Sequence, residues 1–161
     1  YAVDQMAALL GQHGIDSYLV ELGGEIRVAG RRDDGKPWRV AIERPMLERR
    51  EMQMALALEN AAISTAGDYR KFFEHAGQRY SHIIDPSTGR PVKHALASVT
   101  VAAKTCLEAD GWDTALLVMG PDRGFDYAEK NGIAALFIVR VDANYDMQTT
   151  SAWKKQFEKQ D

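Results

Sequence analysis

The sequence has little cysteine and no long apolar run, and these scarcities exclude several classes of protein. Its single cysteine, Cys106, rules out an intramolecular disulfide and any zinc site built from several cysteines. No run of about 18 apolar residues occurs, so no segment is long enough to span a bilayer as a helix. A basic region followed by an apolar stretch, the mark of a secretory signal peptide, is also missing from these residues.

The chain also lacks an excess of charge of either sign. Twenty Lys and Arg residues stand against 23 Asp and Glu, a net charge of -3. The composition therefore gives no general electrostatic attraction to DNA, RNA or anionic membranes, and nucleic acid is not an expected partner. With 161 residues, 45% of them hydrophobic and 27% charged, the chain has the size and composition of one core-forming domain.

The common nucleotide-binding and hydrolase motifs are absent too. The sequence holds no Walker loop, no G-x-G-x-x-G after a strand, no H-E-x-x-H and no G-x-S-x-G. The folds that carry these motifs are disfavoured, and the chemistry must come from other residues.

Apolar periodicity predicts one helix and then a series of strands in the first two thirds of the chain. Residues 1–10 follow a helical pattern without a clear cap before them, which favours a chain cut from something longer. Gly23-Gly24 separates two alternating segments, either as a tight hairpin turn or as a place where a ligand approaches the backbone. Asp33-Asp34-Gly35-Lys36 predicts a hairpin between the strands at 26–29 and 38–42. Further strands are expected at 52–58, 61–65, 69–73, 79–84 and 97–102.

The last third of the chain shows helix signals. Thr105 and Glu108 form a capping box that opens a helix running to Met119, and Gly120-Pro121 ends it. A second helix is expected at 122–131, a buried strand at 133–141, an edge strand at 145–151 and a short helix at 153–157. The predicted fold class is α+β, a mainly antiparallel β-sheet with packed helices in one domain.

His82 differs from the other three histidines, whose positions at 13, 75 and 94 are explained by solvent exposure. It shares a strand face with Tyr80 and Ile84, so it points inward if they do, and it lies three residues before Asp85, where Pro86 ends the strand. One interpretation is a core histidine bonded to a carbonyl, with Asp85 initiating a turn. The other is a general base of near-neutral pKa, held or polarised by Asp85.

Asp110 and Thr114 form a second candidate, because residues at i and i+4 share one helix face. A carboxylate and a hydroxyl suit Mg²⁺, which takes one or two protein carboxylates and fills its shell with water and substrate phosphate. Acidic residues are also common near helix starts, and threonine is ordinary in helices, so the pair can have no function. Asp113, on a different side of the helix, competes as the functional carboxylate.

A third candidate is the segment from Ser64 to Tyr69, where a strand ends in hydroxyls, a glycine and a carboxylate. Such a segment can cradle a phosphate or a ribose, and a polar turn between two strands explains it equally well.

Taken together and in order, these segments resemble the ApbE family over nearly the whole chain. The resemblance is carried by Tyr1-Ala2-Val3-Asp4, Leu22-Gly23-Gly24-Glu25-Ile26, Ile63-Ser64-Thr65-Ala66-Gly67-Asp68-Tyr69, His82-Ile83-Ile84-Asp85-Pro86-Ser87-Thr88-Gly89 and Glu108-Ala109-Asp110 with Thr114. It implies an ApbE-like, T-fold-related architecture that is partial, with residues 1–161 forming its C-terminal portion. The absent N-terminal portion carries further flavin contacts and, just before the position of Tyr1, a glycine-containing stretch of the metal site. The fragment alone is therefore expected to bind FAD weakly and to transfer FMN poorly.

The resemblance also implies an activity and its residues. Family members are FAD:protein FMN transferases, which need Mg²⁺, attach FMN from FAD to a Thr or Ser of a target protein, and release AMP. Two other activities stay open: FAD binding without transfer, and a Mg²⁺-dependent FAD pyrophosphatase giving FMN and AMP. Carried over by position, the catalytic residues are His82 and Asp85, and the metal ligands are Asp110 and Thr114. The FAD-binding residues are Gly23, Gly24, Glu25, Ser64, Thr65, Gly67, Asp68, Tyr69 and His82.

The family further implies partners and a location. Its targets are flavin-accepting subunits of membrane redox complexes. In Gram-negative bacteria its members are lipoproteins at the periplasmic face of the inner membrane, although the present sequence shows no lipobox. Both features are expectations from the resemblance alone.

Overall fold

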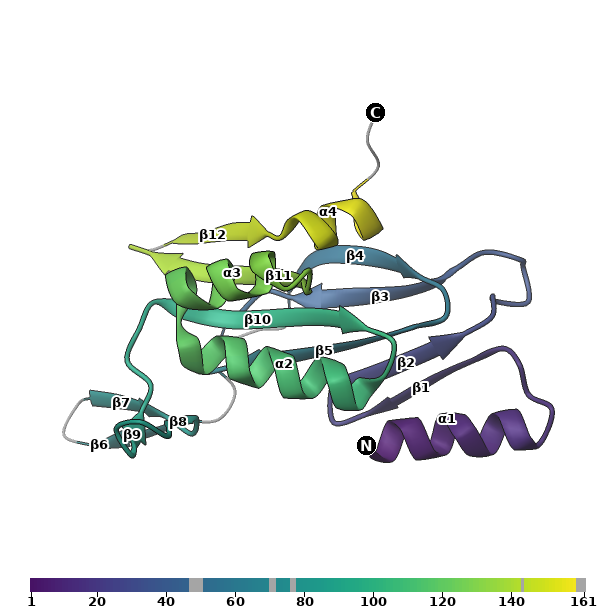
Figure 1. Cartoon of the computed structure of the whole chain (residues 1–161), viewed down its shortest axis with the longest axis horizontal. Helices are drawn as coiled ribbons and strands as arrows, with labels where there is room; N and C mark the ends of the chain where they lie inside the picture. Colours follow the sequence, from purple (N-terminus) through teal and green to yellow (C-terminus); the bar gives the residue numbers. More distant parts are fainter. Residues whose placement is uncertain (47–50, 70–71, 76–77, 143, 159–161) are drawn as a thin grey trace.

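A six-stranded antiparallel sheet forms the centre of the computed structural model (Figure 1). The structure describes residues 1–46, 51–69, 72–75, 78–142 and 144–158. The order of the strands in the sheet is β1-β2-β5-β10-β11-β12, and every neighbouring pair is antiparallel. Their bounds are β1 Tyr18–Leu22, β2 Glu25–Ala29, β5 Ala61–Gly67, β10 Leu96–Ala103, β11 Ala134–Val141 and β12 Asn144–Thr149.

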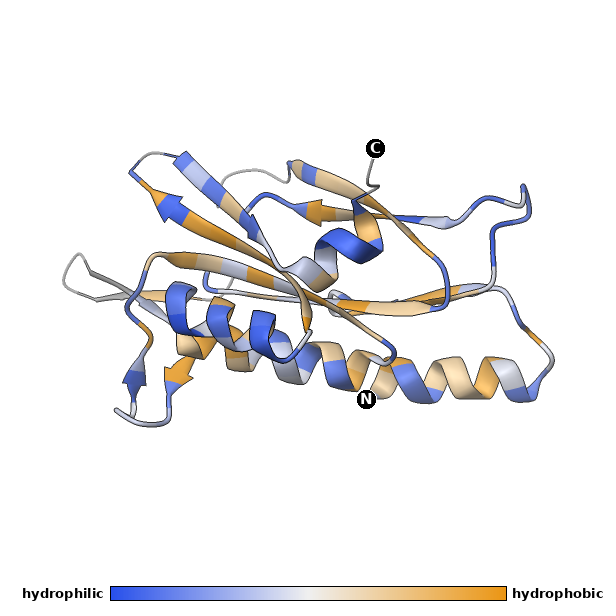
Figure 2. Ribbon diagram, turned by 45° about the horizontal axis from the view of Figure 1, so that its top comes forward, coloured by the Kyte–Doolittle hydropathy of each residue, from blue (hydrophilic) through white to orange (hydrophobic). Residues whose placement is uncertain are grey.

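The two central strands β10 and β11 are apolar because both faces of the sheet are covered there. Seven of the eight residues of β10 are buried, whereas the edge strand β12 has no buried residue. Helices α2 (Cys106–Met119) and α3 (Pro121–Lys130) pack on one face. The hairpin of β3 (Trp38–Glu43) and β4 (Met52–Leu58) packs on the other with α4 (Ser151–Phe157), whose Trp153 is fully buried. In Figure 2 the central strands are mostly hydrophobic and α3 is mostly hydrophilic.

The structure confirms the α+β class and most of the predicted elements, including the capped start of α2. The Thr105 hydroxyl accepts the Glu108 N–H at 3.2 Å, and Gly120 ends the helix. Gly23 and Gly24 close the β1–β2 hairpin with φ values of 71° and 110°, as a two-residue turn with positive φ at both positions requires. Among the described residues no helix is both long and apolar enough to cross a membrane.

The predicted hairpin between residues 26–29 and 38–42 is wrong. β2 pairs with β1 and β5, and β3 pairs with β4 in a separate two-stranded sheet. The Asp33–Lys36 signal does form a turn, in which the Gly35 N–H donates to the Arg32 carbonyl at 2.8 Å. The chain then leaves the sheet, because Val40 and Ile42 bury their side chains in the layer that covers it. Tertiary burial, rather than the local turn, selects the pairing.

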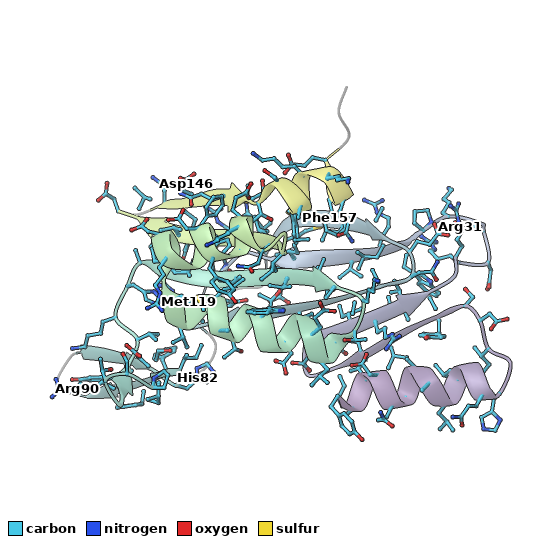
Figure 3. All side chains as sticks on the ribbon, viewed as in Figure 1. Arg31, His82, Arg90, Met119, Asp146 and Phe157 are labelled. Atoms are coloured by element: carbon cyan, nitrogen blue, oxygen red, sulfur yellow. The ribbon has the colours of Figure 1, made fainter. Side chains whose placement is uncertain are left out.

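A small unit of four short strands projects from one end of the sheet (Figure 1). It consists of β6 (Phe72–His75) paired with β7 (Gln78–Ser81), and β8 (Ile84–Asp85) paired with β9 (Arg90–Pro91). Figure 3 shows His82 on this unit, on the side of the molecule where α2 ends at Met119. The unit therefore brings His82 toward one end of α2.

Gly124 allows α3 to pack closely on α2, so Gly124→Ala is expected to destabilise the protein by about 1–3 kcal/mol. A Cβ at this position would lie 2.6 Å from the Leu116 carbonyl oxygen and 3.3 Å from the Phe137 ring. In α2, a Cβ added at Gly111 would meet no described atom within 4 Å other than the backbone of its own helix. Gly111→Ala is therefore expected to stabilise the protein by up to about 1 kcal/mol through helix propensity. Urea unfolding measures the free energy of unfolding of both variants. Changes of the same sign in the two variants would contradict the prediction.

Asp4, in α1 (Ala2–Gln12), is expected to make stability depend on pH in the acid range. Partial burial raises its pKa, but hydrogen bonds from the Leu107 and Cys106 N–H groups and the charge of Arg27 outweigh burial and hold the pKa below its ordinary value of 3.8. The stabilisation is therefore complete above 3.8 and is lost as the pH falls through the folded-state pKa. Asp4→Ala should cost about 1–2 kcal/mol at pH 7. The cost should shrink in urea titrations as the pH is lowered below 3.8, and a loss independent of pH would contradict this account.

Candidate functional site

Asp110 and Thr114 lie one turn apart on α2, and both side chains are exposed. The prediction that they share a face is confirmed. Ala109 and Leu116 of the same helix are fully buried, so the helix packs through those positions and presents the carboxylate and the hydroxyl outward. This arrangement offers two hard oxygen ligands to a cation that approaches from solvent.

Asp113 lies beneath this pair and is 1% exposed. Its Oδ1 accepts a hydrogen bond from the Thr114 hydroxyl at 3.1 Å, and its Oδ2 has no hydrogen-bond partner among the described residues. Burial raises the pKa of Asp113 to about 7. The hydroxyls of Ser64 and Thr114 oppose the rise, and the charge of Asp110 adds to it. Asp113 and Asp110 thus face different sides of the helix, as the sequence predicts.

The oxygen atoms of this group fit Mg²⁺ better than a softer metal. Asp110 and Thr114 supply hard donors, and the neighbouring Asp113 has a buried Oδ2 with no hydrogen-bond partner among the described residues. Within the described part of the chain, no group of three or more His, Cys, Asp or Glu side chains is placed to hold a metal ion. A magnesium ion here must complete its shell with water, substrate or other protein oxygens.

His82 follows β7 and is exposed. His82 is expected to point inward only if Tyr80 and Ile84 do, and that condition is not met, because Ile84 is 48% exposed while Ser81 and Ile83 are buried. Ile83 packs into the core beneath α2 and α3, and its N–H donates to the Ser81 hydroxyl at 3.1 Å. The segment therefore turns Ser81 and Ile83 to the core, and His82 lies on the solvent side.

Asp85 organises the turn that follows His82. Its Oδ1 accepts hydrogen bonds from the Ser87 N–H at 2.8 Å and the Ser87 hydroxyl at 2.7 Å. These bonds, the hydroxyl first, lower the pKa of Asp85. Gly89, with φ of 66°, donates its N–H to the Asp85 carbonyl at 2.8 Å and closes the turn. These are the contacts of a residue that initiates a turn, which is one of the two interpretations of Asp85 from the sequence.

The predicted FAD-binding residues of β5 lie on two faces of the sheet. Ser64 is buried on the face covered by α2, whereas the Thr65 hydroxyl lies 2.8 Å from that of Thr100 on the other face. The Gly23-Gly24-Glu25 turn lies beside Ser64, because Ile26 pairs with Ile63 in the neighbouring strands. A single ligand therefore cannot contact both hydroxyls from one side.

Gly67 and Tyr69 act as a packed pair. Tyr69 is buried over Gly67, where a Cβ would lie 2.5 Å from the ring. Neighbouring Asp68 forms a two-pronged ion pair with Arg140 of β11, in which Nη1 lies 3.0 Å from Oδ2. Burial alone lowers the pKa of Arg140, but Asp68 outweighs it and raises the pKa above its ordinary value. No local sequence signal marks Arg140, because its pairing with Asp68 spans 72 residues.

Asp68 and Arg140 open onto a cavity of about 460 Å³ between the β6–β9 unit and the sheet. Its remaining lining residues are Ser81, Val92, Lys93 and His94. Solvent exposure does not explain His94, contrary to expectation: it is only half-exposed, and both ring nitrogens are buried without a hydrogen-bond partner in the described part of the chain. Its ring packs against Gly120. Another hollow, of about 650 Å³, contains none of the predicted site residues.

The predicted site residues thus form two groups. Asp110 and Thr114 lie on the outer face of α2, above Asp113 and Ser64. His82 and Asp85 lie on the projecting unit of β6 to β9. Asp68 lines the cavity between this unit and the sheet. The model of the ApbE family matches residues 1–137. The chain belongs to the ApbE family.

Curated and solved relatives of this ApbE-family chain agree with that assignment. It is 48% identical over 154 residues to the FAD:protein FMN transferase of Vibrio cholerae, covering 96% of the chain and 46% of that protein. The Haemophilus influenzae FAD:protein FMN transferase is 44% identical over 156 residues, with 96% and 45% covered. The chain thus spans about half the length of the curated relatives it matches.

Solved structures show the same fold. The apo flavinyl transferase ApbE of Pseudomonas stutzeri superposes with a TM-score of 0.86 at 46% identity, covering 99% of the chain and 49% of that structure. The ApbE protein of Thermotoga maritima superposes with a TM-score of 0.85 at 28% identity, over 99% of the chain and 51% of that structure. This ApbE-family chain therefore has the same fold as about half of each of these two proteins.

Proposed function

We propose that the full-length protein, meaning this chain with any sequence that flanks it in its gene, is a Mg²⁺-dependent FAD:protein FMN transferase. It moves FMN from FAD to a Thr or Ser hydroxyl of a target protein and releases AMP. The outward oxygen pair of Asp110 and Thr114 carries the proposal, in a chain 48% identical to a protein named for this activity. A transferase that cleaves a pyrophosphate needs such a cation site.

The reaction makes one phosphorus–oxygen bond and breaks another. The acceptor hydroxyl attacks the FMN-side phosphorus of FAD, the bond from that phosphorus to the bridging oxygen breaks, and AMP leaves. When bound, Mg²⁺ would supply positive charge to the pyrophosphate oxygens. Asp110 and Thr114 would hold the ion, and because the Thr114 hydroxyl donates its hydrogen bond to Asp113, the oxygen lone pairs of Thr114 would face the cation. Asp113 therefore belongs to the metal group as a positioning residue.

His82 acts as the general base in this proposal. Its exposed imidazole accepts the proton of the acceptor hydroxyl as the new bond forms. Asp85 stabilises the turn after His82 by accepting two hydrogen bonds from Ser87, and the turn positions the imidazole. In-line phosphoryl transfer needs a base for the attacking hydroxyl and a cation on the pyrophosphate, and we assign these roles to the projecting unit and to α2.

FAD binds along these two groups. We assign Gly23, Gly24, Glu25 and Ser64 to one end of its site, and leave out Thr65, whose hydroxyl lies on the opposite face of the sheet. Gly67, Asp68, Tyr69 and His82 form the other end, beside the projecting unit. Acceptors in membrane redox complexes and a periplasmic lipoprotein location stay predictions from the family resemblance.

One incubation tests the proposal. Full-length protein is mixed with FAD, Mg²⁺ and a target domain that carries the acceptor threonine, and both AMP and the mass of the target are measured. The proposal expects AMP and an FMN-sized mass increase, both lost with EDTA, and no mass increase on a target whose acceptor is alanine. AMP without an adduct indicates the pyrophosphatase instead, and FAD binding with neither product indicates a flavin-binding protein.

A further inference from the structure

Asp4 joins the start of α1 to the start of α2. Its Oδ1 accepts the N–H of Cys106 at 3.0 Å, and its Oδ2 accepts the N–H of Leu107 at 2.9 Å, across more than 100 residues of sequence. The first N–H groups of a helix have no partner within the helix. Here Asp4 satisfies two of them, and Thr105 satisfies that of Glu108. The N-terminus of α2 is thus capped by two different means, one local and one from another helix.

The carboxylate also fixes where α2 begins in space. Figures 1 and 2 show the start of α1 against the start of α2, so the positive ends of two helix dipoles meet there. Asp4 supplies negative charge between them and bonds to Arg27 of β2, with Nη1 2.5 Å from Oδ1. The Asp4 side chain is 13% exposed, and Cys106 is fully buried beside Val3. Three elements therefore meet at one carboxylate.

The residues that α2 carries give this junction a functional meaning. Asp110 comes three residues after Leu107, and Thr114 one turn later, on a continuous helix that moves as a rigid rod with 1.5 Å of rise per residue. A shift or rotation of the first turn is therefore passed directly to both side chains. The Gly23-Gly24-Glu25 turn stays on the sheet, so such a shift also changes its position relative to the oxygen pair.

We propose that Asp4 is a positioning residue for the Mg²⁺ site, setting the axial position and rotation of α2 that aim Asp110 and Thr114 at the cation. The inference rests on the proposed function, because it needs those two residues to be ligands. Residues that orient metal ligands without touching the metal typically change its affinity 10- to 100-fold when replaced. The same size of effect is expected here.

Thr105 distinguishes positioning from ordinary helix stability. Thr105→Ala removes the local cap of the same helix end and leaves the Asp4 bonds in place. If Asp4 only stabilised α2, the two alanine variants would weaken metal binding alike. If Asp4 positions α2, Asp4→Ala has much the larger effect. Asp4→Asn falls between, because an amide oxygen can replace only one of the two carboxylate acceptors.

The test uses full-length apo protein titrated with Mn²⁺, followed by electron paramagnetic resonance, with Mg²⁺ as competitor. Asp4→Ala is expected to weaken binding about 10-fold or more, Thr105→Ala less than about 3-fold, and the exposed Gln5→Ala not at all. Hydrogen exchange at Cys106 and Leu107 is expected to rise in Asp4→Ala and confirms that the junction is broken. Asp110→Ala marks the site by losing the metal signal.

Each outcome decides the inference. Wild-type affinity in Asp4→Ala, or equal weakening by Asp4→Ala and Thr105→Ala, overturns the positioning role while the Asp110 site and the proposed function stand. A wild-type protein that binds no Mn²⁺ or Mg²⁺, or an Asp110→Ala variant that binds normally, overturns the metal step of the proposed function and this inference with it. Weakening confined to Asp4 variants supports it.

Discussion

Asp110→Asn is expected to lower the FMN-transfer rate of the full-length protein about 100-fold or more. A bound cation stabilises transition-state charge by several kcal/mol, and each 1.36 kcal/mol is a factor of ten in rate. The amide keeps the size of the side chain and removes the charge that binds the ion. Initial rates of AMP release over a range of Mg²⁺ concentrations measure the loss, which higher Mg²⁺ is expected to restore in part.

Asp122→Asn is the matched control, since Asp122 is also an exposed carboxylate in a helix packed on the same face of the sheet. It is expected to keep the wild-type rate. Equal rates for wild type and Asp110→Asn at limiting Mg²⁺ would show that the metal lies elsewhere, with Asp113 as the next carboxylate to replace.

His82→Ala is expected to lower the transfer rate about 100- to 10,000-fold, the usual contribution of a general base. Mg²⁺ affinity is expected to change little, because the imidazole acts on the acceptor proton and not on the cation. Added imidazole is expected to restore part of the rate, as a small base can fill the space of the lost side chain. Single-turnover transfer at saturating FAD measures the chemical step.

His13→Ala, at the exposed end of α1, provides the histidine control and is expected to be neutral. A His82 variant with a normal transfer rate would contradict the base assignment. Loss of FAD binding with an unchanged single-turnover rate would place His82 in substrate binding alone.

Local signals predicted the second half of the fold well. Thr105, Glu108 and Gly120 mark both ends of α2, and the apolar run at 133–141 matches β11 closely. These elements are set by neighbours in sequence, through caps and by burial on both faces. The pairing of β3 with β4 instead of β2 depends on which surface each strand covers, and no turn signal contains that information.

The site divides in the same way. The shared face of Asp110 and Thr114 follows from helix geometry and is confirmed. Strand alternation correctly grouped exposed His82 with exposed Ile84, but it could not say which face meets the core; Ile83 determines that. The partners Arg140 for Asp68 and Asp4 for α2 are distant in sequence, so only the folded chain reveals them.

The intact mass of the target domain tests the central claim most directly. After incubation with FAD, Mg²⁺ and full-length protein, the domain is expected to gain the mass of one FMN with wild type and none within the same time with Asp110→Asn. An unmodified target with wild-type protein, under conditions where a curated relative modifies it fully, would contradict FMN transfer by this protein. Equal modification by both proteins would contradict the Asp110 metal site.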